Sequence, residues 1–365
     1  MTIFRSAETM RLGLVGPLPP PSGGMAMQTM QLARLLSEEG VEVEIVQTNA
    51  PYRPEVAGKI RGVRAVFRLL PYLWRVWRLA GRVNVIHLMA NSGWSWQLFA
   101  APVIWIAALR KTPVIVNYRG GEAREYLAAS ERWVKPSMVK ASGLIVPSGF
   151  LQQVFGEFDL PSAVIPNIID LQTFHPAQTS PEEGVFNVAI TRNLEPIYGL
   201  DVAIQAVALS RETIPGICLK IAGSGPQREE LEDLARQLGV EDNVDFLGRL
   251  ERDEIVSLYH SAHAALNPTR VDNMPNSVLE ALACGLPVIS TNVGGVPFIV
   301  RDGETALLVP PDDAQAMAKA LVALHSDAQL RDRLSEGGQR EVAQYAWNEV
   351  GPKWLALYNK LAVAA

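Results

Sequence analysis

Short apolar runs alternate with amphipathic segments along the whole chain. Residues 27–39 carry apolar side chains at helical spacing and end at Gly40, which predicts a helix. Apolar or alternating runs in the first half predict strands at residues 12–15, 41–47, 85–89, 114–118, 143–146 and 163–165. This alternation is typical of a parallel sheet covered by helices on both faces.

The second half repeats the scheme. Strands are predicted at residues 186–191, 218–222, 244–247, 264–266, 288–291 and 306–309, and helices at residues 201–210, 228–238 and 277–283. Residues 175–184 are polar and proline-rich, which indicates a linker. We therefore expect two doubly wound α/β domains, residues 1–175 and 176–345, facing each other across a cleft, and a closing segment at residues 346–365. Ligands of such sheets bind beyond the carboxyl ends of the strands, so the cleft is the expected site.

The composition indicates a globular protein of the cytoplasm. The 365 residues are enough for two domains, with 48% hydrophobic and 19% charged residues. Cys218 and Cys284 both lie in apolar segments, which favours reduced thiols over a disulfide. The start of the chain predicts no secretory leader. The most apolar stretch, residues 93–109, is interrupted by polar residues and a proline, so it predicts a buried helix rather than a membrane span.

The net charge of −5 conceals an asymmetry between the two halves. Residues 1–175 hold 18 Lys and Arg and 12 Asp and Glu, a net of +6. The remainder holds 33 − 18 = 15 basic and 38 − 12 = 26 acidic residues, a net of −11. A basic half beside an acidic half suggests that the two domains bind different partners. Nucleic acid is not an expected partner, because no nucleic-acid motif occurs and the pI is about 5.7.

Residues 59–82 form a basic segment without a single acid. Its aromatic and aliphatic residues alternate with seven basic ones: Lys59, Arg61, Arg64, Arg68, Arg75, Arg78 and Arg82. A helix of this kind can lie on an anionic membrane surface, with arginines at the headgroups and tryptophans at the interface. The alternative is a helix that buries its apolar stripe in the N-terminal domain. The sequence leaves both open.

The segment 267–290 carries the clearest chemistry. Asp272 lies in the loop after a predicted strand, and a helix opens near Asn276 or Ser277, residue types that cap helices well. The unpaired amides and positive dipole of a helix start form an anion site. Glu280 lies about one turn further on. Two carboxylates for hydroxyl groups and free amides for phosphate oxygens suit a phosphorylated sugar.

This segment resembles the signature of the family 4 retaining glycosyltransferases, which have the GT-B fold of two Rossmann-like domains. The family has two glutamates separated by seven residues and then A-x-A-C-G-x-P-V; here Asp272 and Glu280 precede Ala-Leu-Ala-Cys-Gly-Leu-Pro-Val. The resemblance implies transfer with retention from a UDP- or GDP-linked sugar in the C-terminal domain. It implies that Asp272 contacts the donor sugar and Glu280 the ribose hydroxyls. The residues that would meet the sugar and pyrophosphate are Asn273, Met274, Pro275, Asn276 and Ser277.

Other segments resemble the family in order. Residues 14–25 are similar to its N-terminal glycine loop, in which Gly23 and Gly24 would approach phosphate or acceptor, although a plain turn is an equal alternative. Residues 246–249, with Gly248, resemble the strand beside the nucleobase. Residues 345–358 resemble the closing helix that crosses back onto the N-terminal, acceptor-binding domain. The implied acceptor is a glycan or a lipid-linked molecule.

Three positions depart from the family pattern. Asp272 replaces the first glutamate, Tyr198 stands at a lysine position, and Arg119 stands where a strand usually ends in histidine. Tyr198 brings no charge, so Arg192 carries more of the phosphate neutralisation. Arg119 cannot act as a base at neutral pH, and it is either a clamp for sugar or phosphate or a surface arginine after a strand.

We find no general base and no metal-binding pattern in the sequence. His87 ends a strand and is expected in the core. The prediction is a metal-free enzyme without a cofactor, in cell-surface polysaccharide or glycolipid biosynthesis, peripheral on the inner membrane face. Helix-end amides and Arg192 would stabilise the leaving diphosphate. Two alternatives stay open: a GT-B sugar-nucleotide epimerase, and a non-catalytic donor-binding scaffold of a polysaccharide assembly complex.

Overall fold

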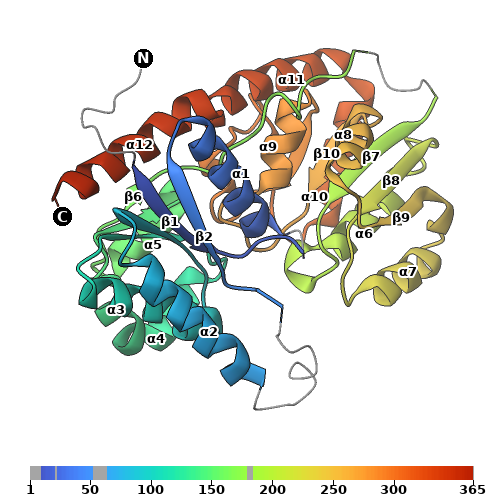
Figure 1. The fold of residues 1–365 in the computed structure, drawn as a ribbon. Coiled ribbons are helices and arrows are strands. Elements are labelled where there is room, and N and C mark those ends of the chain that lie inside the picture. Colours follow the sequence, from blue (N-terminus) through green and yellow to red (C-terminus); the bar gives the residue numbers. More distant parts are fainter. Residues whose placement is uncertain (1–9, 21–22, 52–63, 179–183, 365) are drawn as a thin grey trace. The chain divides into compact units, whose positions relative to one another are not determined.

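A computed structural model describes residues 10–20, 23–51, 64–178 and 184–364 (Figure 1). The chain divides into an N-terminal unit, Met1–Ile168 with Trp347–Ala365, and a C-terminal unit, Ile169–Ala346. Residues 59–63 of the predicted basic helix, 179–183 of the predicted linker, and Pro21 and Ser22 of the predicted glycine loop lie outside the described residues.

The N-terminal unit contains a parallel sheet of six strands in the order β2-β1-β3-β4-β5-β6. The strands are β1 (Arg11–Gly16), β2 (Glu42–Gln47), β3 (Val85–Ala90), β4 (Val114–Tyr118), β5 (Gly143–Val146) and β6 (Ala163–Val164). The helices are α1 (Gly24–Glu38), α2 (Arg64–Leu79), α3 (Ala101–Leu109), α4 (Ala123–Met138), α5 (Gly149–Glu157) and α12 (Trp347–Ala364), with the π-helix η2 (Trp96–Ala100) before α3.

The strands β1, β3 and β4 have buried residues on both faces of this sheet, since successive strand residues point to opposite sides. Leu12 and Leu14 of β1 share a core cluster with α1 and α12, whereas Val15 belongs to the cluster beneath α2, α3, α4 and α5. Trp354 and Tyr358 of α12 are almost fully buried there. The predicted return of the closing helix to the N-terminal domain is therefore confirmed.

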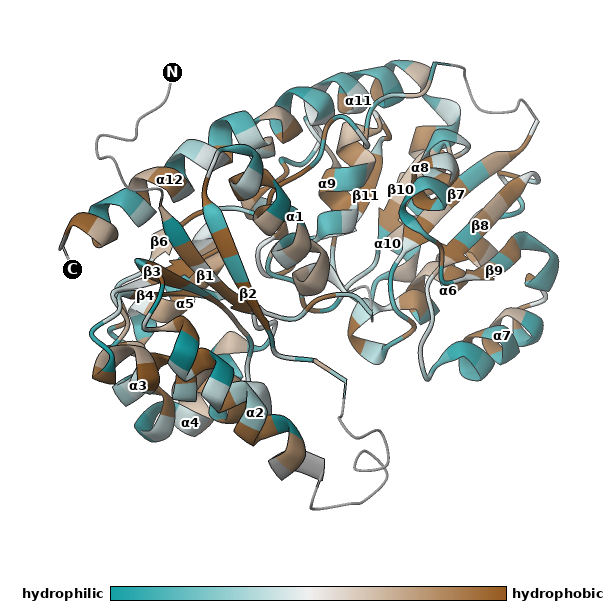
Figure 2. Ribbon diagram, viewed as in Figure 1, coloured by the Kyte–Doolittle hydropathy of each residue, from teal (hydrophilic) through white to brown (hydrophobic). Residues whose placement is uncertain are grey.

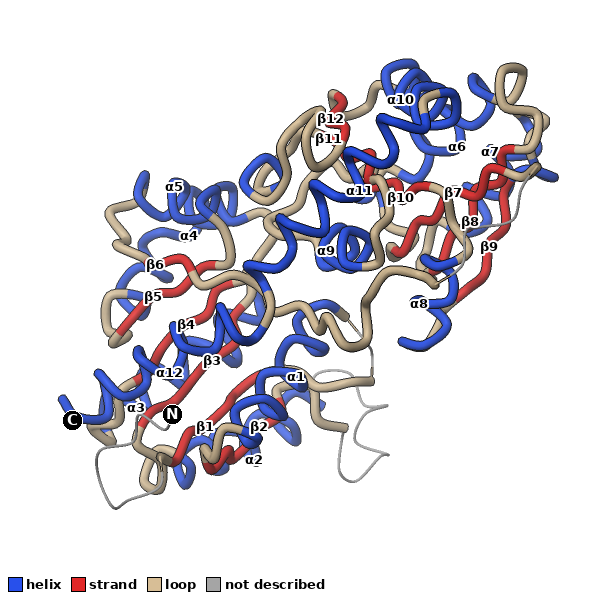
Figure 3. The backbone as a smooth tube through the Cα atoms, turned by 90° about the horizontal axis from the view of Figure 1, so that it is seen from above, coloured by secondary structure: helices blue, strands red, loops and turns tan. Residues whose placement is uncertain are grey.

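The C-terminal unit repeats this architecture in the order β12-β11-β10-β7-β8-β9, again with parallel pairing. Its strands are β7 (Phe186–Thr191), β8 (Ile217–Ala222), β9 (Val244–Gly248), β10 (Ala264–Asn267), β11 (Val288–Thr291) and β12 (Leu307–Val309). Its helices are α6 (Leu200–Ser210), α7 (Arg228–Gln237), α8 (Arg252–His260), α9 (Asn276–Ala283), α10 (Ala314–Ser326) and α11 (Ala328–Val342). In each unit, strands lie between helices (Figure 3).

The predicted class, two doubly wound α/β domains, is confirmed. All predicted strands form within one or two residues of the expected bounds, but α4, α5, α10 and α11 were not assigned from the pattern. The expectation of a buried helix at residues 93–109 is wrong in part. Trp96 is buried, but Trp105 and Leu109 of α3 are 45% and 73% exposed. Among the described residues, no helix combines the length and apolar character needed to cross a membrane.

Candidate active site

The candidate site lies where the strand order of the C-terminal sheet reverses. From β7 the chain continues to β8 and β9 on one side, and then to β10, β11 and β12 on the other. The carboxyl ends of β7 and β10 are therefore neighbours with diverging connections, which is where open α/β sheets bind ligands. Arg192 directly follows β7, and Asn267 ends β10.

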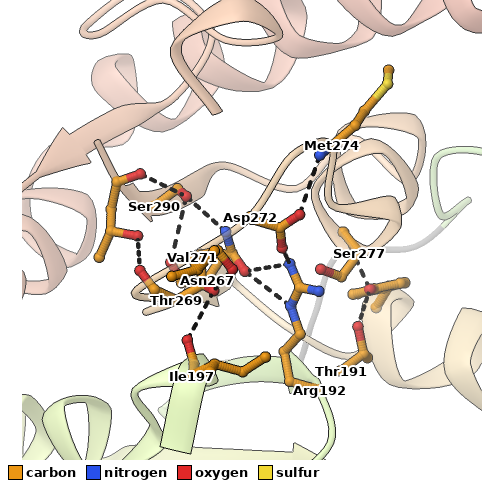
Figure 4. A network of polar contacts seen from close by, with 12 residues as sticks. Thr191, Arg192, Ile197, Asn267, Thr269, Val271, Asp272, Met274, Ser277 and Ser290 are labelled. Atoms are coloured by element: carbon orange, nitrogen blue, oxygen red, sulfur yellow. Dashed lines mark hydrogen bonds and ion pairs between the residues drawn. The ribbon is translucent and has the colours of Figure 1, made fainter. Parts of the chain in front are cut away.

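Arg192 is held by two acceptors at this edge (Figure 4). Its Nε and Nη2 donate to Asn267 Oδ1 at 3.0 and 2.8 Å, and Nη2 donates to Asp272 Oδ2 at 2.5 Å. The Arg192 and Asp272 side chains are only 12% and 13% exposed, so little water screens this ion pair. No hydrogen bond within the described residues engages Nη1 of Arg192, which keeps one arm of the guanidinium for another acceptor.

Asp272 is fixed by both of its carboxylate oxygens. One accepts from Arg192, and Oδ1 accepts the backbone amide of Met274 at 3.2 Å. Asn267 is oriented in turn, because its Nδ2 donates to Ser290 Oγ at 2.9 Å. A carboxylate engaged on both oxygens orients its neighbours well but is a poor nucleophile.

Tyr198 lies against Arg192, with the guanidinium carbon 5.0 Å from the ring centroid. It belongs to the 3-10 turn η3 (Pro196–Tyr198), which ends at Gly199 with φ 62°. A Cβ on Gly199 would lie 2.2 Å from the backbone oxygen of Pro268, so this turn requires glycine. The backbone amide of Arg270 stabilises the turn by donating to Ile197 O at 2.7 Å. The ring is thus positioned as a support for Arg192.

Helix α9 begins at Asn276, as predicted, but its capping was predicted wrongly. Pro275 occupies the N-cap and makes no side-chain capping hydrogen bond. Asn276 and Ser277 instead occupy the first helical turn, because the rigid φ of proline suits the position before it. The dipole of α9 therefore points its positive end at the loop that carries Asp272.

Glu280 lies one turn into α9 and is linked to the end of β7. The Tyr259 hydroxyl donates to Glu280 Oε2 at 3.4 Å and lies 2.5 Å from Thr191 Oγ1. Burial raises the pKa of Glu280 from 4.5 to about 7, and the charges of Arg252 and Arg192 oppose this rise only in part. A small pocket beside these groups is lined by Thr191, Tyr259, Asn267 and Ser277, among others.

Two glycine segments shape the surroundings. The amide of Gly295 donates to Asp272 O at 2.9 Å, and a Cβ on Gly295 would lie 1.7 Å from Asn273 O. The loop of Asp272 thus rests directly on a glycine backbone. Gly248 ends β9 with φ 71°, and its carbonyl accepts the amide of Gly223 at 2.7 Å. Gly248 therefore lies at the same carboxyl edge of the sheet.

The remaining predicted residues lie in the N-terminal unit. Gly23 is the N-cap of α1 and Gly24 is its first residue; among the described residues, apart from its chain neighbours, no atom lies within 4 Å of a Cβ built on Gly23. Arg119 follows β4 and donates from Nη1 to Asn167 Oδ1, while its buried Nε has no partner among the described residues. Burial lowers the pKa of Arg119 to about 10.

His87 is a core residue, as predicted. It is fully buried, and its Nδ1 lies 2.7 Å from the Tyr358 hydroxyl of α12. Burial and the charge of Arg119 lower its pKa to about 3. A histidine that stays neutral and hydrogen-bonded inside the unit has no role as an exposed base.

The structure brings together Arg192, Tyr198, Asp272 and Glu280. Sequence reasoning missed Asn267 and Tyr259, which connect these residues. Asn267 could have been suspected as a polar residue at the carboxyl end of a buried strand. Tyr259 gave no signal, because a tyrosine at an apolar helical position is read as core.

Comparisons with known proteins agree over nearly the whole chain. Residues 172–341 match the family model described as glycosyl transferases group 1, and residues 22–173 match glycosyltransferase family 4. The D-inositol 3-phosphate glycosyltransferase of Salinispora tropica is 26% identical, covering 93% of this chain and 81% of the relative. The glycogen synthase of Mycobacterium tuberculosis strain H37Rv is 25% identical, covering 96% and 94%.

Solved structures show the same fold. The sucrose-phosphate synthase of Thermosynechococcus elongatus superposes with a TM-score of 0.77 at 22% identity, covering 98% of this chain and 100% of that one. HepE of Anabaena, solved in complex with UDP-glucose, gives a TM-score of 0.72 at 18% identity, covering 96% and 100%.

Proposed function

This chain belongs to glycosyltransferase family 4, the retaining enzymes of the GT-B fold that use nucleotide-sugar donors, and we propose which donor and acceptor it takes. The donor is a UDP- or GDP-linked sugar bound at the carboxyl edge of the C-terminal sheet. The acceptor is a glycan or a lipid-linked molecule bound by the N-terminal unit. The reaction serves cell-surface polysaccharide or glycolipid synthesis at the cytoplasmic face of a membrane.

The cluster of Arg192, Asn267 and Asp272 before the start of α9 carries this proposal. The α9 amides and Nη1 of Arg192 would hold the diphosphate, whose negative charge grows as the sugar leaves. Asp272 would accept a hydroxyl of the transferred sugar, and Glu280 the ribose hydroxyls. The bond from the anomeric carbon to phosphate breaks while the bond to the acceptor oxygen forms, and the acceptor proton passes to the diphosphate.

A UDP-sugar is the donor we favour. HepE, which shares the fold, was solved in complexes with UDP and with UDP-glucose. The site proposed here relies on helix-end amides and on one arm of Arg192, and needs no metal ion to hold the diphosphate. Gly23, Gly24 and Arg119 are proposed to meet phosphate or acceptor groups from the N-terminal unit.

The test is binding and hydrolysis of a panel of UDP-, GDP- and ADP-sugars, with and without a chelator. We expect one donor class to bind, with slow release of nucleotide that the chelator does not change. Arg192→Ala should reduce turnover by about a hundredfold or more. Arg236→Ala, which removes an arginine that is 61% exposed on α7, is the matched control.

Four outcomes would contradict the proposal. A strict requirement for Mn²⁺ or Mg²⁺ would exclude the metal-free site, and an inverted product anomer would exclude retention. Selective binding without turnover, even with membrane extract as a source of acceptor, would favour a donor-binding scaffold. Conversion of the donor sugar without any acceptor would indicate an epimerase.

A further inference from the structure

We propose that α2 and the end of α3 form a docking face for an anionic phospholipid bilayer. The inference rests on the proposed function in one respect: the docking face would give the enzyme access to a lipid-linked acceptor. Its evidence is independent, because it comes from the exposed surface of the N-terminal unit alone. The α2–α3 face is defined by Phe67, Leu70, Trp74, Trp77 and Arg78 of α2 and by Leu109 and Arg110 at the end of α3.

Helix α2 carries two separate apolar stripes. Tyr72, Val76 and Leu79 are spaced by four and three residues and are almost fully buried in the core of the unit. A second set is also spaced by three and four residues but is exposed: Phe67 by 43%, Leu70 by 62%, Trp74 by 58% and Trp77 by 44%. A helix that only covers a sheet needs one stripe. The second stripe therefore requires another apolar environment.

The end of α3 continues this stripe. The Arg110 guanidinium lies 4.9 Å from the centroid of the Trp77 ring, which joins α3 to α2 at the surface. Its chain neighbour Leu109 is 73% exposed. The two helices also pack against each other in the same core cluster. Hydrophobic (brown) and hydrophilic (teal) residues follow one another along the α2 ribbon (Figure 2).

The chain segment that forms this face is strongly basic, and one of its cations, Arg82, pairs with Glu44 of β2 at 3.7 Å. Residues 56–121 contain no Asp or Glu and ten basic residues: Lys59, Arg61, Arg64, Arg68, Arg75, Arg78, Arg82, Arg110, Lys111 and Arg119. The Arg78 guanidinium lies 4.6 Å from the Trp74 ring centroid, so a cation and an aromatic ring lie side by side on the surface of α2. Tryptophan beside arginine suits the headgroup boundary, where the ring enters the interface and the cation meets lipid phosphate.

The position of α2 places part of this face near the proposed acceptor site. Arg68 Nη2 donates to Thr48 O at 2.6 Å, and Thr48 directly follows β2. The first half of α2 therefore lies near the carboxyl edge of the N-terminal sheet, the edge at which β4 leads to Arg119. A bilayer on the α2–α3 face would present a lipid-linked sugar close to the proposed acceptor edge of the same unit.

The experiment is co-sedimentation of the full chain, without donor, with vesicles of one part phosphatidylglycerol to two parts phosphatidylcholine. We expect binding that is lost with pure phosphatidylcholine. Arg75→Glu with Arg78→Glu should lower partitioning by about tenfold or more. Trp74→Ala with Trp77→Ala should do the same and abolish a vesicle-induced blue shift of tryptophan fluorescence. The matched control, Arg236→Glu with Arg340→Glu, changes the charge equally at arginines that are 61% and 73% exposed in the C-terminal unit, and should bind normally.

Each outcome decides the proposal. It is overturned if the wild type does not bind anionic vesicles, or if the α2 charge variant and the control bind equally. It is also overturned if the wild type is a dimer that the Trp74 and Trp77 substitutions dissociate, since the face then joins two copies. Circular dichroism must show that each variant is folded. Donor hydrolysis without vesicles should be the same in the α2 charge variant and the wild type. A wild type that binds vesicles but hydrolyses no donor refutes the proposed function and not this face.

Discussion

The raised pKa of Glu280 predicts that this residue costs the protein stability at neutral pH and above. Burial in α9 raises this pKa from 4.5 to about 7. The folded state therefore binds a proton between these values where the unfolded chain does not. The contribution of Glu280 to stability must therefore fall as pH rises from about 4.5 to about 7, and its full penalty is present above pH 7. Glu280→Gln removes the titration while it keeps the shape.

The size of the effect follows from the two values. A rise from 4.5 to about 7 corresponds to roughly 3 kcal/mol at ~1.4 kcal/mol per pH unit. Glu280 is not fully buried, so solvent screening reduces this to about 2 kcal/mol. We expect Glu280→Gln to be more stable than the wild type by about this amount near pH 8, and to differ little from it near pH 4.

Urea unfolding of both proteins across this pH range is the assay. Glu229→Gln, at an exposed position on α7, is the matched control and should follow the wild type. Nucleotide affinity supplies a second readout. If Glu280 binds the ribose as proposed, the wild type should gain affinity for UDP relative to Glu280→Gln as pH rises through about 7, because only a carboxylate offers acceptors alone to the two hydroxyls. An equal stability difference at both ends of the range would refute the reasoning.

Three further predictions concern the groups around Arg192. Tyr198→Phe should change donor affinity little, whereas Tyr198→Ala should lower it by roughly tenfold, because the ring supports the Arg192 guanidinium. Equal losses of affinity for the two variants in titration calorimetry would mean that the hydroxyl binds the donor. Gly295→Ala should destabilise the protein by about 1–3 kcal/mol in urea unfolding, because its methyl group would collide with Asn273 O; an unchanged midpoint would contradict this. Asp272→Asn should bind UDP at least as tightly as the wild type, because the change removes a negative charge near the proposed phosphate site. Transfer should fall about a hundredfold, because the proposed ligand of the sugar hydroxyl is lost. Weaker UDP binding would show that Asp272 mainly positions Arg192.

The sequence predicted the sheets well because both are buried on two sides. Strands such as β4 and β7 are mainly apolar, each with one asparagine, and their observed bounds equal the predicted ones. Helices such as α4 and α11 were missed because they carry many polar residues, and their buried positions are known only once their neighbours are placed. The periodicity of a sequence identifies the apolar face of a helix, but not the elements that pack against that face.

The same limit applied to the candidate site. Asp272 and Glu280 were found because their spacing is local in the sequence. The partners of Arg192 were not found, since Asn267 lies 75 residues away and Asp272 lies 80 residues away along the chain. The exposed stripe of α2 shows the opposite case: residues 59–82 were read as either membrane-binding or core-facing, and the described part has both an exposed and a buried apolar stripe.

The pairing of Arg192 with Asp272 bears on the missing lysine. In this structure the charge of Arg192 is balanced by a carboxylate 2.5 Å away, so the two groups together offer a diphosphate little net charge. A lysine at position 198 would add a cation beside Arg192, whereas Tyr198 offers an aromatic face that holds the guanidinium in place. The fixed positive element at this edge is then the start of α9, where the dipole of the helix has its positive end. Donor phosphates that engage Arg192 would compete with Asp272 and free a carboxylate oxygen for a sugar hydroxyl. Recognition of the phosphate and of the sugar would thereby be coupled through one guanidinium.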